Sequence, residues 1–242
     1  MDGMQHLTGS LTGTSITNVT SISGSTLQTI GGNLTLASGT LLNSLNFPAL
    51  SSVGGISFTA LGPGYQNLGF GNVSQIGGLS IIDTYLQSLT GISMTSGNAI
   101  DIAQNQYLNN ITLETKTLTG LLSLSANANG QAAVSLPDLT SAGGIDIRNA
   151  SSVALPVLAN TTSGDVSLVG NNFQSLSLPA LTSTNGLTVE NNNQMSNMSV
   201  PKLGNVGASV NVWNNSALTG AINFPVLTNV VGSVYVVGAY SK

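Results

Sequence analysis

Paired carboxylates are the residues of this chain with the clearest catalytic potential, since two acidic groups about 5–10 Å apart can hydrolyse a glycosidic bond. The chain has only eight Asp and Glu residues. Asp101 and Asp146 take the same outward position in two repeats, and one repeat with Ser123 at that position separates them. At a rung spacing of about 4.8 Å the two carboxylates would lie about 10 Å apart. Arg148 follows Asp146 on the same face, which indicates instead an ion pair between solvated surface groups.

Other catalytic and metal-binding groups are scarce. His6 is the sole histidine, close to the N-terminus where a frayed surface position is expected, and cysteine is absent. A histidine-activated nucleophile and a zinc site therefore lack their usual residues. The basic residues are scattered and the net charge is −4, which excludes a nucleic-acid footprint; they are Lys116, Arg148, Lys202 and Lys242. We expect no enzyme activity, no catalytic residue, no metal and no cofactor.

Asparagine is a candidate for modification in this chain. Eight Asn residues begin the Asn-x-Ser/Thr acceptor motif for N-glycosylation: Asn18, Asn33, Asn72, Asn110, Asn149, Asn160, Asn197 and Asn214. About six or seven such motifs would arise by chance in a chain so rich in Asn, Ser and Thr, so their number alone proves nothing. We expect these residues to lie on exposed turns.

The elements that position these residues come from a short repeat. Leu/Val/Phe-Pro-x-Leu recurs at Pro137, Pro156, Pro179, Pro201 and Pro225, at intervals of 19–24 residues. Pro48 begins the same unit, and units of similar length fit between it and Pro137 if Gly71, Thr90 and Glu114 take the proline position. A period of this length is typical of solenoids.

Each unit continues with a Gly-rich turn and a short strand. Apolar and polar residues alternate in segments such as 100–102 and 187–189, which predicts a strand with one wet face. An Asn follows three residues after the second apolar position, and we predict that these Asn form a buried ladder bonded to turn backbone: Asn105, Asn127, Asn171, Asn192 and Asn215.

Two further apolar positions per unit predict roughly three extended sides in each coil. No apolar residues recur with the spacing of an amphipathic helix. The sequence therefore predicts an all-β fold, a parallel β-helix or solenoid of about ten leucine-rich, L-domain-like coils, which forms a single repeat domain over residues 1–242. Because 230–237 ends on an apolar rung where a solenoid needs a polar cap, we expect truncation at both ends.

The outward side chains of the strands should stack in columns. The first column is Ser57, Ser80, Asp101, Ser123, Asp146, Ser167, Thr188 and Asn211. The second is Thr59, Ile82, Ala103, Ser125, Arg148, Val169, Glu190 and Trp213. Such a face could hydrogen-bond glucan hydroxyls or order water, but the mixed second column disfavours ice binding. Trp213 could stack on a sugar, although packing against the neighbouring rung is the simpler interpretation.

Charged residues make up 5% of the chain, and no apolar run approaches the length of a membrane span.

The chain resembles fungal cell-wall organisation proteins of the sporulation-specific, GPI-anchored family with receptor L-domain-like repeats. The resemblance lies in the Pro-x-Leu-Thr-Ser-x-Gly-Gly units, the Asn after each strand and the stretch 101–108. Ser57 to Leu203 carries this similarity. Members of that family have a secretion signal, Cys-bearing caps and a Ser-rich tail with a GPI signal, and we expect none of these within residues 1–242.

The resemblance implies a non-catalytic glycoprotein in the cell wall or on the outer face of the plasma membrane. Its implied partners are wall polysaccharide or wall proteins, and it would reach a membrane only through a GPI anchor. Two alternatives remain: a β-helical polysaccharide-active enzyme that uses Asp101 and Asp146, and a carbohydrate-binding or ice-binding surface protein.

Overall fold

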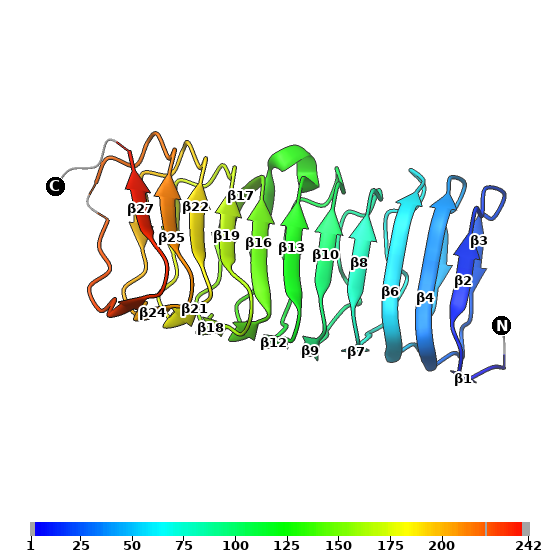
Figure 1. The fold of residues 1–242 in the computed structure, drawn as a ribbon. Coiled ribbons are helices and arrows are strands. Elements are labelled where there is room, and N and C mark those ends of the chain that lie inside the picture. The colour runs from blue at the N-terminus through cyan, green and yellow to red at the C-terminus, as the bar shows by residue number, and fades with distance from the viewer. Residues whose placement is uncertain (1–2, 221, 239–242) are drawn as a thin grey trace.

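A computed structural model describes residues 3–220 and 222–238 and shows an elongated parallel β-solenoid of about ten coils (Figure 1). Every strand pair is parallel, as stacking of successive coils requires. Across the described residues the helical structure consists of one short 3-10 turn, η1 (Asn127–Gly130). The predicted all-β solenoid is confirmed.

The largest sheet forms one long side of the solenoid, which we call the broad face. Its strands, in spatial order, are β1 (His6–Leu7), β4 (Thr29–Gly39), β6 (Ser52–Leu61), β8 (Leu79–Ile82), β10 (Ile100–Ala103), β13 (Leu121–Ser125), β16 (Gly144–Arg148), β19 (Val166–Val169), β22 (Leu187–Glu190), β25 (Val210–Trp213) and β27 (Val234–Val237). Two more strands pair at its N-terminal part: β2 (Leu11–Thr14) with β4, and β7 (Gln75–Ile76) with β6.

Shorter strands form the other two sides of each coil. One side contains three small sheets: β11 (Asn110–Thr112), β14 (Ala132–Ser135) and β17 (Ala150–Ala154); β20 (Ser175–Ser177) and β23 (Asn197–Ser199); β3 (Ser21–Ser23) and β5 (Ser44–Asn46). The other is one sheet: β26 (Asn229–Val230), β24 (Asn205–Val206), β21 (Ser183–Thr184), β18 (Asn160–Thr161), β15 (Ser141–Ala142), β12 (Thr117–Leu118) and β9 (Ser96–Gly97). Each coil therefore has three extended sides, as the spacing of the apolar residues predicts.

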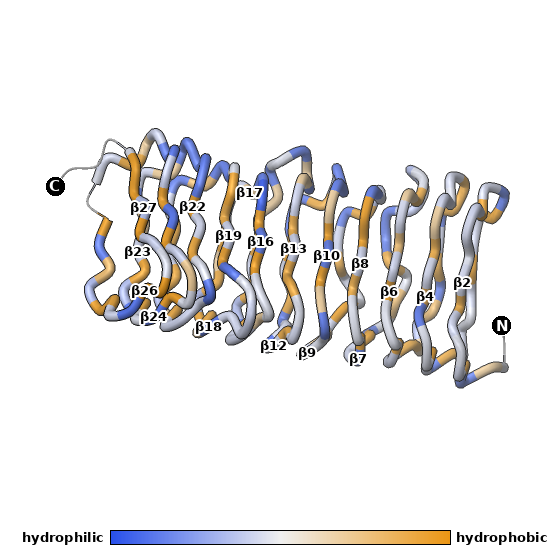
Figure 2. Tube along the Cα trace, viewed as in Figure 1, coloured by the Kyte–Doolittle hydropathy of each residue, from blue (hydrophilic) through white to orange (hydrophobic). Residues whose placement is uncertain are grey.

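The core is a continuous stack of aliphatic side chains inside the coils. In β10 the side chains of Ile100 and Ile102 are fully buried, whereas Asp101 between them is half-buried and faces outward. The same alternation runs through the successive strands of the broad face (Figure 2). Near the N-terminal end Tyr65 packs edge-on against Phe58 in the core, and burial raises the pKa of its hydroxyl. Period-2 patterning alone therefore accounts for which side chains form the core.

Each proline of the repeat lies in a tight turn, which buried residues flank from Pro48 to Pro201 and partly buried residues flank at Pro225. In the unit at Pro137, the backbone N–H of Leu139 donates to the carbonyl of Leu136 (3.4 Å), and Leu181 donates to Leu178 in the same way (3.3 Å). Proline suits the second position of such a turn because its fixed φ matches and its missing N–H is not needed there. The spacing of the prolines therefore sets the spacing of the turns.

The first glycine of each Gly-Gly pair is required by close contact between coils. A Cβ on Gly54 would lie 2.7 Å from the carbonyl oxygen of Gly32, and one on Gly77 would lie 2.2 Å from that of Gly54. No side chain fits at these distances, so the backbones of neighbouring coils meet directly at this corner.

The corner at the other end of each broad-face strand has left-handed backbone. The residue just before the ladder position has a positive φ in each coil: Ser15, Ser38, Ala60, Asp83, Gln104, Ala126, Asn149, Gly170, Asn191 and Asn214. Half of these residues are Ser, Ala or Gln, whereas Gly, Asn and Asp are the types that adopt this conformation at lower cost. Tertiary packing therefore imposes the turn on residues that do not favour it.

We expect Gly170→Ala to lower the free energy of unfolding by about 1 kcal/mol, because φ is +66° there and a Cβ is strained in that region. Gly78→Ala is the matched control, since Gly78 has no positive φ and the nearest atom to its added Cβ is 3.7 Å away. That change should stabilise the chain by about 0.4–1 kcal/mol, because alanine restricts the unfolded state. Urea unfolding measures both; equal effects at the two sites would contradict the corner geometry.

Candidate functional site

All five asparagines of the predicted ladder are buried, with exposed fractions of 0–2%. Each side-chain amide donates to a backbone carbonyl of the preceding coil; for Asn192 the acceptor is Leu168 (2.9 Å) and for Asn215 it is Val189 (2.9 Å). The side-chain oxygen of Asn192 in turn accepts from the backbone N–H of Asn171 (2.8 Å). The ladder therefore joins consecutive coils, and its oxygens satisfy backbone N–H groups that lie just beyond the strands.

Thr84 and Ala150 take the ladder position next to the asparagines. Thr84 precedes Asn105 in the column, and both its N–H and its hydroxyl donate to the Asn105 oxygen (3.0 and 2.7 Å). Ala150 lies between Asn127 and Asn171, where its N–H donates to the Asn171 oxygen (2.9 Å) but its side chain offers no amide. The ladder is thus divided into two runs, and the sequence pattern did not identify Thr84 as a member.

The eight sequon asparagines lie on the surface, and seven of them are exposed. Asn160 is half-buried in β18 and accepts a hydrogen bond from the hydroxyl of Ser141 (2.9 Å). The expectation that all of them lie on turns is wrong for four, which the structure places in strands: Asn33 in β4, Asn110 in β11, Asn160 in β18 and Asn197 in β23. Outward strand positions are as accessible as turns in a solenoid, because only one face of each strand is covered.

The register of the broad face confirms both predicted outward columns. Asp101 pairs with Ser123 of β13, and Ser123 pairs with Asp146 of β16, so the two carboxylates are separated by one rung. The predicted ion pair is present: Arg148 Nε donates to both oxygens of Asp146, at 2.9 and 3.1 Å. This contact raises the pKa of the Arg148 guanidinium. Asp146 is therefore neutralised locally, whereas Asp101 is not.

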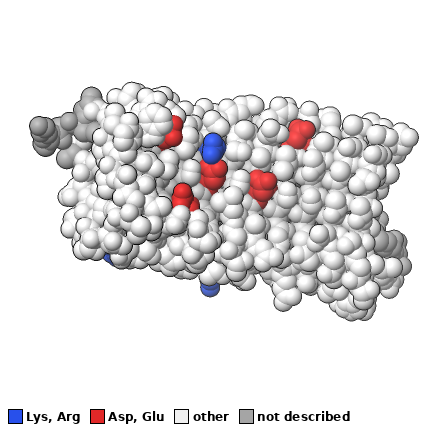
Figure 3. All heavy atoms as spheres, in the orientation of Figure 1, with Lys and Arg blue, Asp and Glu red and all other residues white. Residues whose placement is uncertain are grey.

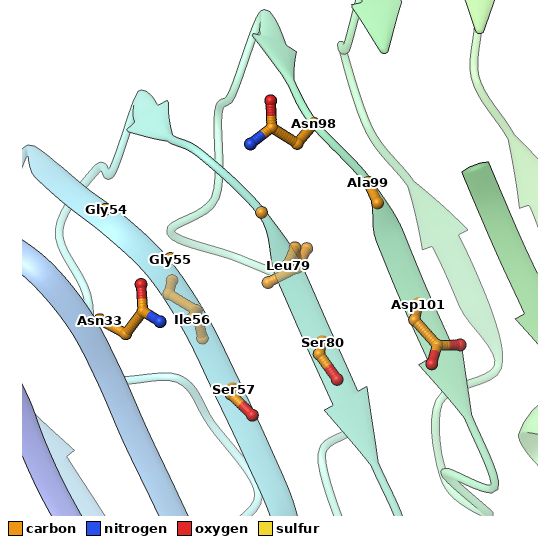
Figure 4. Close-up of a pocket in the computed structure, with 11 residues that line it drawn as sticks. Asn33, Gly54, Gly55, Ile56, Ser57, Leu79, Ser80, Asn98, Ala99 and Asp101 are labelled. Atoms are coloured by element: carbon orange, nitrogen blue, oxygen red, sulfur yellow. The ribbon is translucent and has the colours of Figure 1, made fainter. Parts of the chain in front are cut away.

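Asp101 lines a hollow in the broad face with a volume of about 430 Å³ (Figure 4). We call it the Gly78 hollow. It lies where β4, β6, β8 and β10 run side by side, and its walls carry the side chains of Asn33, Ser57, Ser80, Asn98 and Asp101. Figure 4 shows Ser57, Ser80 and Asp101 in a row on adjacent strands. The sequence identified this row as a column but gave no sign of the depression beside it.

Most of the described carboxylates gather on the broad face, with a single basic group among them (Figure 3). Several are engaged by neighbours: Asn185 donates to Asp165 (2.7 Å), and Asn191 donates to Glu190 (2.7 Å). Lys116 and Lys202 are exposed away from that face, and Lys242 lies outside the described residues. The face is therefore polar and mildly acidic.

The remaining candidates from the sequence are surface residues with neighbours. His6 lies in β1, paired with β4, and its Nδ1 is 2.9 Å from the Thr29 hydroxyl, so it is held rather than frayed. Trp213 is 37% exposed and its ring meets Tyr235 edge-on, with centroids 6.5 Å apart.

No group of three metal-ligating side chains occurs in the described part of the chain. Nor does that part contain a helix with the length and apolar character to cross a membrane.

Two curated fungal proteins are similar to this chain. Protein ecm33 of Aspergillus fumigatus is 35% identical over 125 residues, which are 51% of this chain and 31% of that protein. A cell surface GPI-anchored protein of Arthroderma benhamiae is 34% identical over 161 residues, which are 66% of this chain and 41% of the relative. The chain thus spans less than half the length of these relatives.

No protein-family model matches the chain, and no solved structure matches it. The two relatives nevertheless confirm the resemblance to fungal GPI-anchored proteins that the repeat motifs indicated, and they fit a cell-surface protein.

Proposed function

We propose that this chain is a non-catalytic, cell-surface β-solenoid glycoprotein that helps to organise a fungal-type cell wall. The observation that carries the proposal is its similarity to two fungal proteins, one of which is described as a GPI-anchored cell surface protein. The proposed location is the cell wall or the outer face of the plasma membrane, and the proposed partners are wall polysaccharide or wall proteins.

The broad face supports this role physically. Its first outward column, from Ser57 to Asn211, presents hydroxyl, amide and carboxylate groups at regular rung spacing. Groups of this kind hydrogen-bond the hydroxyls of a polysaccharide, and many weak contacts along one polymer add up by multivalency. Parallel stacking keeps the face rigid, so little conformational freedom is lost on contact.

The proposal predicts retention on wall material without cleavage. The purified chain should sediment with insoluble fungal wall polysaccharide, while reducing ends stay at the level of the blank. The same chain centrifuged without wall material controls for its own aggregation. An unchanged soluble concentration in the presence of wall would contradict the proposed function.

One observation favours a polysaccharide-active enzyme as the second candidate: Asp101 lines the Gly78 hollow and has no basic neighbour comparable to the Arg148 that binds Asp146. Against it, the candidate pair lacks a second free carboxylate at the required separation, because Asp146 is held by Arg148.

We expect Asp101→Asn to leave reducing-end formation unchanged, because the parent chain should form none above the blank. Asp138→Asn, which alters an exposed carboxylate of a proline turn, is the matched control. Release of reducing ends by the parent that disappears in Asp101→Asn and persists in Asp138→Asn would establish the enzyme and overturn our proposal.

A further inference from the structure

Gly78 has no structural reason to be glycine. Its backbone does not have a positive φ, and a Cβ built on it meets no atom closer than 3.7 Å. This differs from Gly77 beside it, where a Cβ would lie 2.2 Å from a backbone oxygen. The missing side chain of Gly78 is therefore not required by the fold, but it does open the hollow in the broad face.

Gly78 lies in a third outward column of the broad face, and further along this column neighbouring side chains lie over the glycines. A Cβ on Gly144 would lie 3.4 Å from a methyl group of Leu121, and one on Gly186 would lie 2.8 Å from the carboxylate of Asp165. The column is thus largely filled towards the C-terminal end. Between β4 and β10 it passes through Gly55, Gly78 and Ala99; the Asn33 side chain lies over Gly55, 2.9 Å from an added Cβ, whereas Gly78 remains open.

The polar groups around the opening are available to a ligand. Within residues 3–220 and 222–238, the side chains of Asn33, Ser57, Ser80 and Asp101 make no hydrogen bond to other protein groups. Asn98 is the exception, because its oxygen accepts from the Thr119 hydroxyl (3.3 Å). By contrast, the carboxylates of Asp146, Asp165 and Glu190 on the same face are all bonded.

The chemistry of the hollow restricts its ligand. It contains no basic side chain, so an anion would gain nothing there, and a single carboxylate is too few ligands for a metal ion. A peptide cannot add as a strand, because β6 and β8 are each paired on both edges. What remains is a neutral molecule with many hydroxyl or amide groups, and the volume of about 430 Å³ falls in the range of roughly 300–1,000 Å³ of small-ligand sites.

We propose that the Gly78 hollow is a binding site for a segment of neutral polysaccharide, whose hydroxyl groups would hydrogen-bond the side chains of Asn33, Ser57 and Ser80 and donate to the carboxylate of Asp101. The site would take a sugar ring over Gly78 and Ala99, beside the Asn33 side chain, with the rest of the polymer lying along the outward columns. This inference rests on the proposed function and adds to it the place of contact and the class of ligand.

The test uses the whole 242-residue chain produced without glycosylation, so that Asn33 is unmodified. β-1,3-Glucan hexaose and β-1,4-N-acetylglucosamine hexaose are titrated calorimetrically into the parent chain, Gly78→Leu and Asp101→Asn. We expect the parent to bind one of the two oligomers, and each variant to bind it at least tenfold more weakly. Ser167→Leu, a half-buried outward position of β19 away from the hollow, is the matched control and should bind as the parent does.

Thermal unfolding of each variant establishes that it is folded. Equal binding by the parent and both hollow variants, or no binding of either oligomer by the parent, would overturn the inference. Sedimentation with insoluble wall separates this failure from that of the proposed function. If the wall material retains the parent and Gly78→Leu equally, the hollow is not the binding site, but the proposed wall role stands. If the wall material retains neither protein, the proposed wall role itself is refuted.

Discussion

Replacing Asn192 with alanine should lower the free energy of unfolding by roughly 1–3 kcal/mol, the cost of leaving buried polar groups without partners. Its amide donates to the carbonyl of Leu168, and its oxygen accepts from the backbone N–H of Asn171. Both groups lie beside a fully buried side chain, where water does not replace the lost bonds. Asn171→Ala should have a similar effect, because Asn171 donates to Ile147 (3.0 Å) and accepts from Ala150 (2.9 Å). Urea unfolding of parent and variants measures the differences.

Asn110→Ala is the control for the ladder. Asn110 is also an asparagine in a short strand, but its side chain is exposed on β11, so its replacement should change stability by less than about 0.5 kcal/mol. Small and equal losses at Asn110, Asn171 and Asn192 would refute a stabilising role for the ladder.

The second large effect concerns the C-terminal rung. In the described residues β27 pairs with β25 alone, and its interior positions Val234 and Val236 remain 55% and 37% exposed, although their partners Val210 and Val212 are fully buried. Exposed apolar side chains on a terminal strand favour association with another chain. We therefore expect the 242-residue chain to associate at micromolar concentrations.

Sedimentation velocity over a range of concentrations measures this association. The control is the same chain extended by one polar coil after β27, which should remain monomeric at concentrations where the parent associates. If the parent sediments as a monomer with the stability of the extended chain, its terminal rung is already covered and the prediction is wrong.

The sequence alone was sufficient for the architecture, because the features that define a parallel solenoid are local and periodic. Alternation in segments such as 100–102 determines which side chains point inward, and the recurring proline turn determines the length of each coil. Once coils of similar length stack in register, equivalent positions must meet, so the Asn of one coil reaches the turn of the previous coil. The outward columns follow from the same argument, and so does the pairing of Asp146 with Arg148.

Only the tertiary structure decided the features that depend on contacts between coils, because these contacts differ from one coil to the next. The pattern could not show that Thr84 joins the ladder or that Ala150 interrupts it, because the bonds there are made by neighbouring coils. It could not distinguish Gly77, where a Cβ would clash with a backbone oxygen, from Gly78, where a Cβ would make only an ordinary contact. The hollow beside Asp101 exists because no long side chain from an adjacent rung covers Gly78, as Leu121 covers Gly144. Whether a surface position is filled is a property of its spatial neighbours, and a single strand's sequence does not contain them.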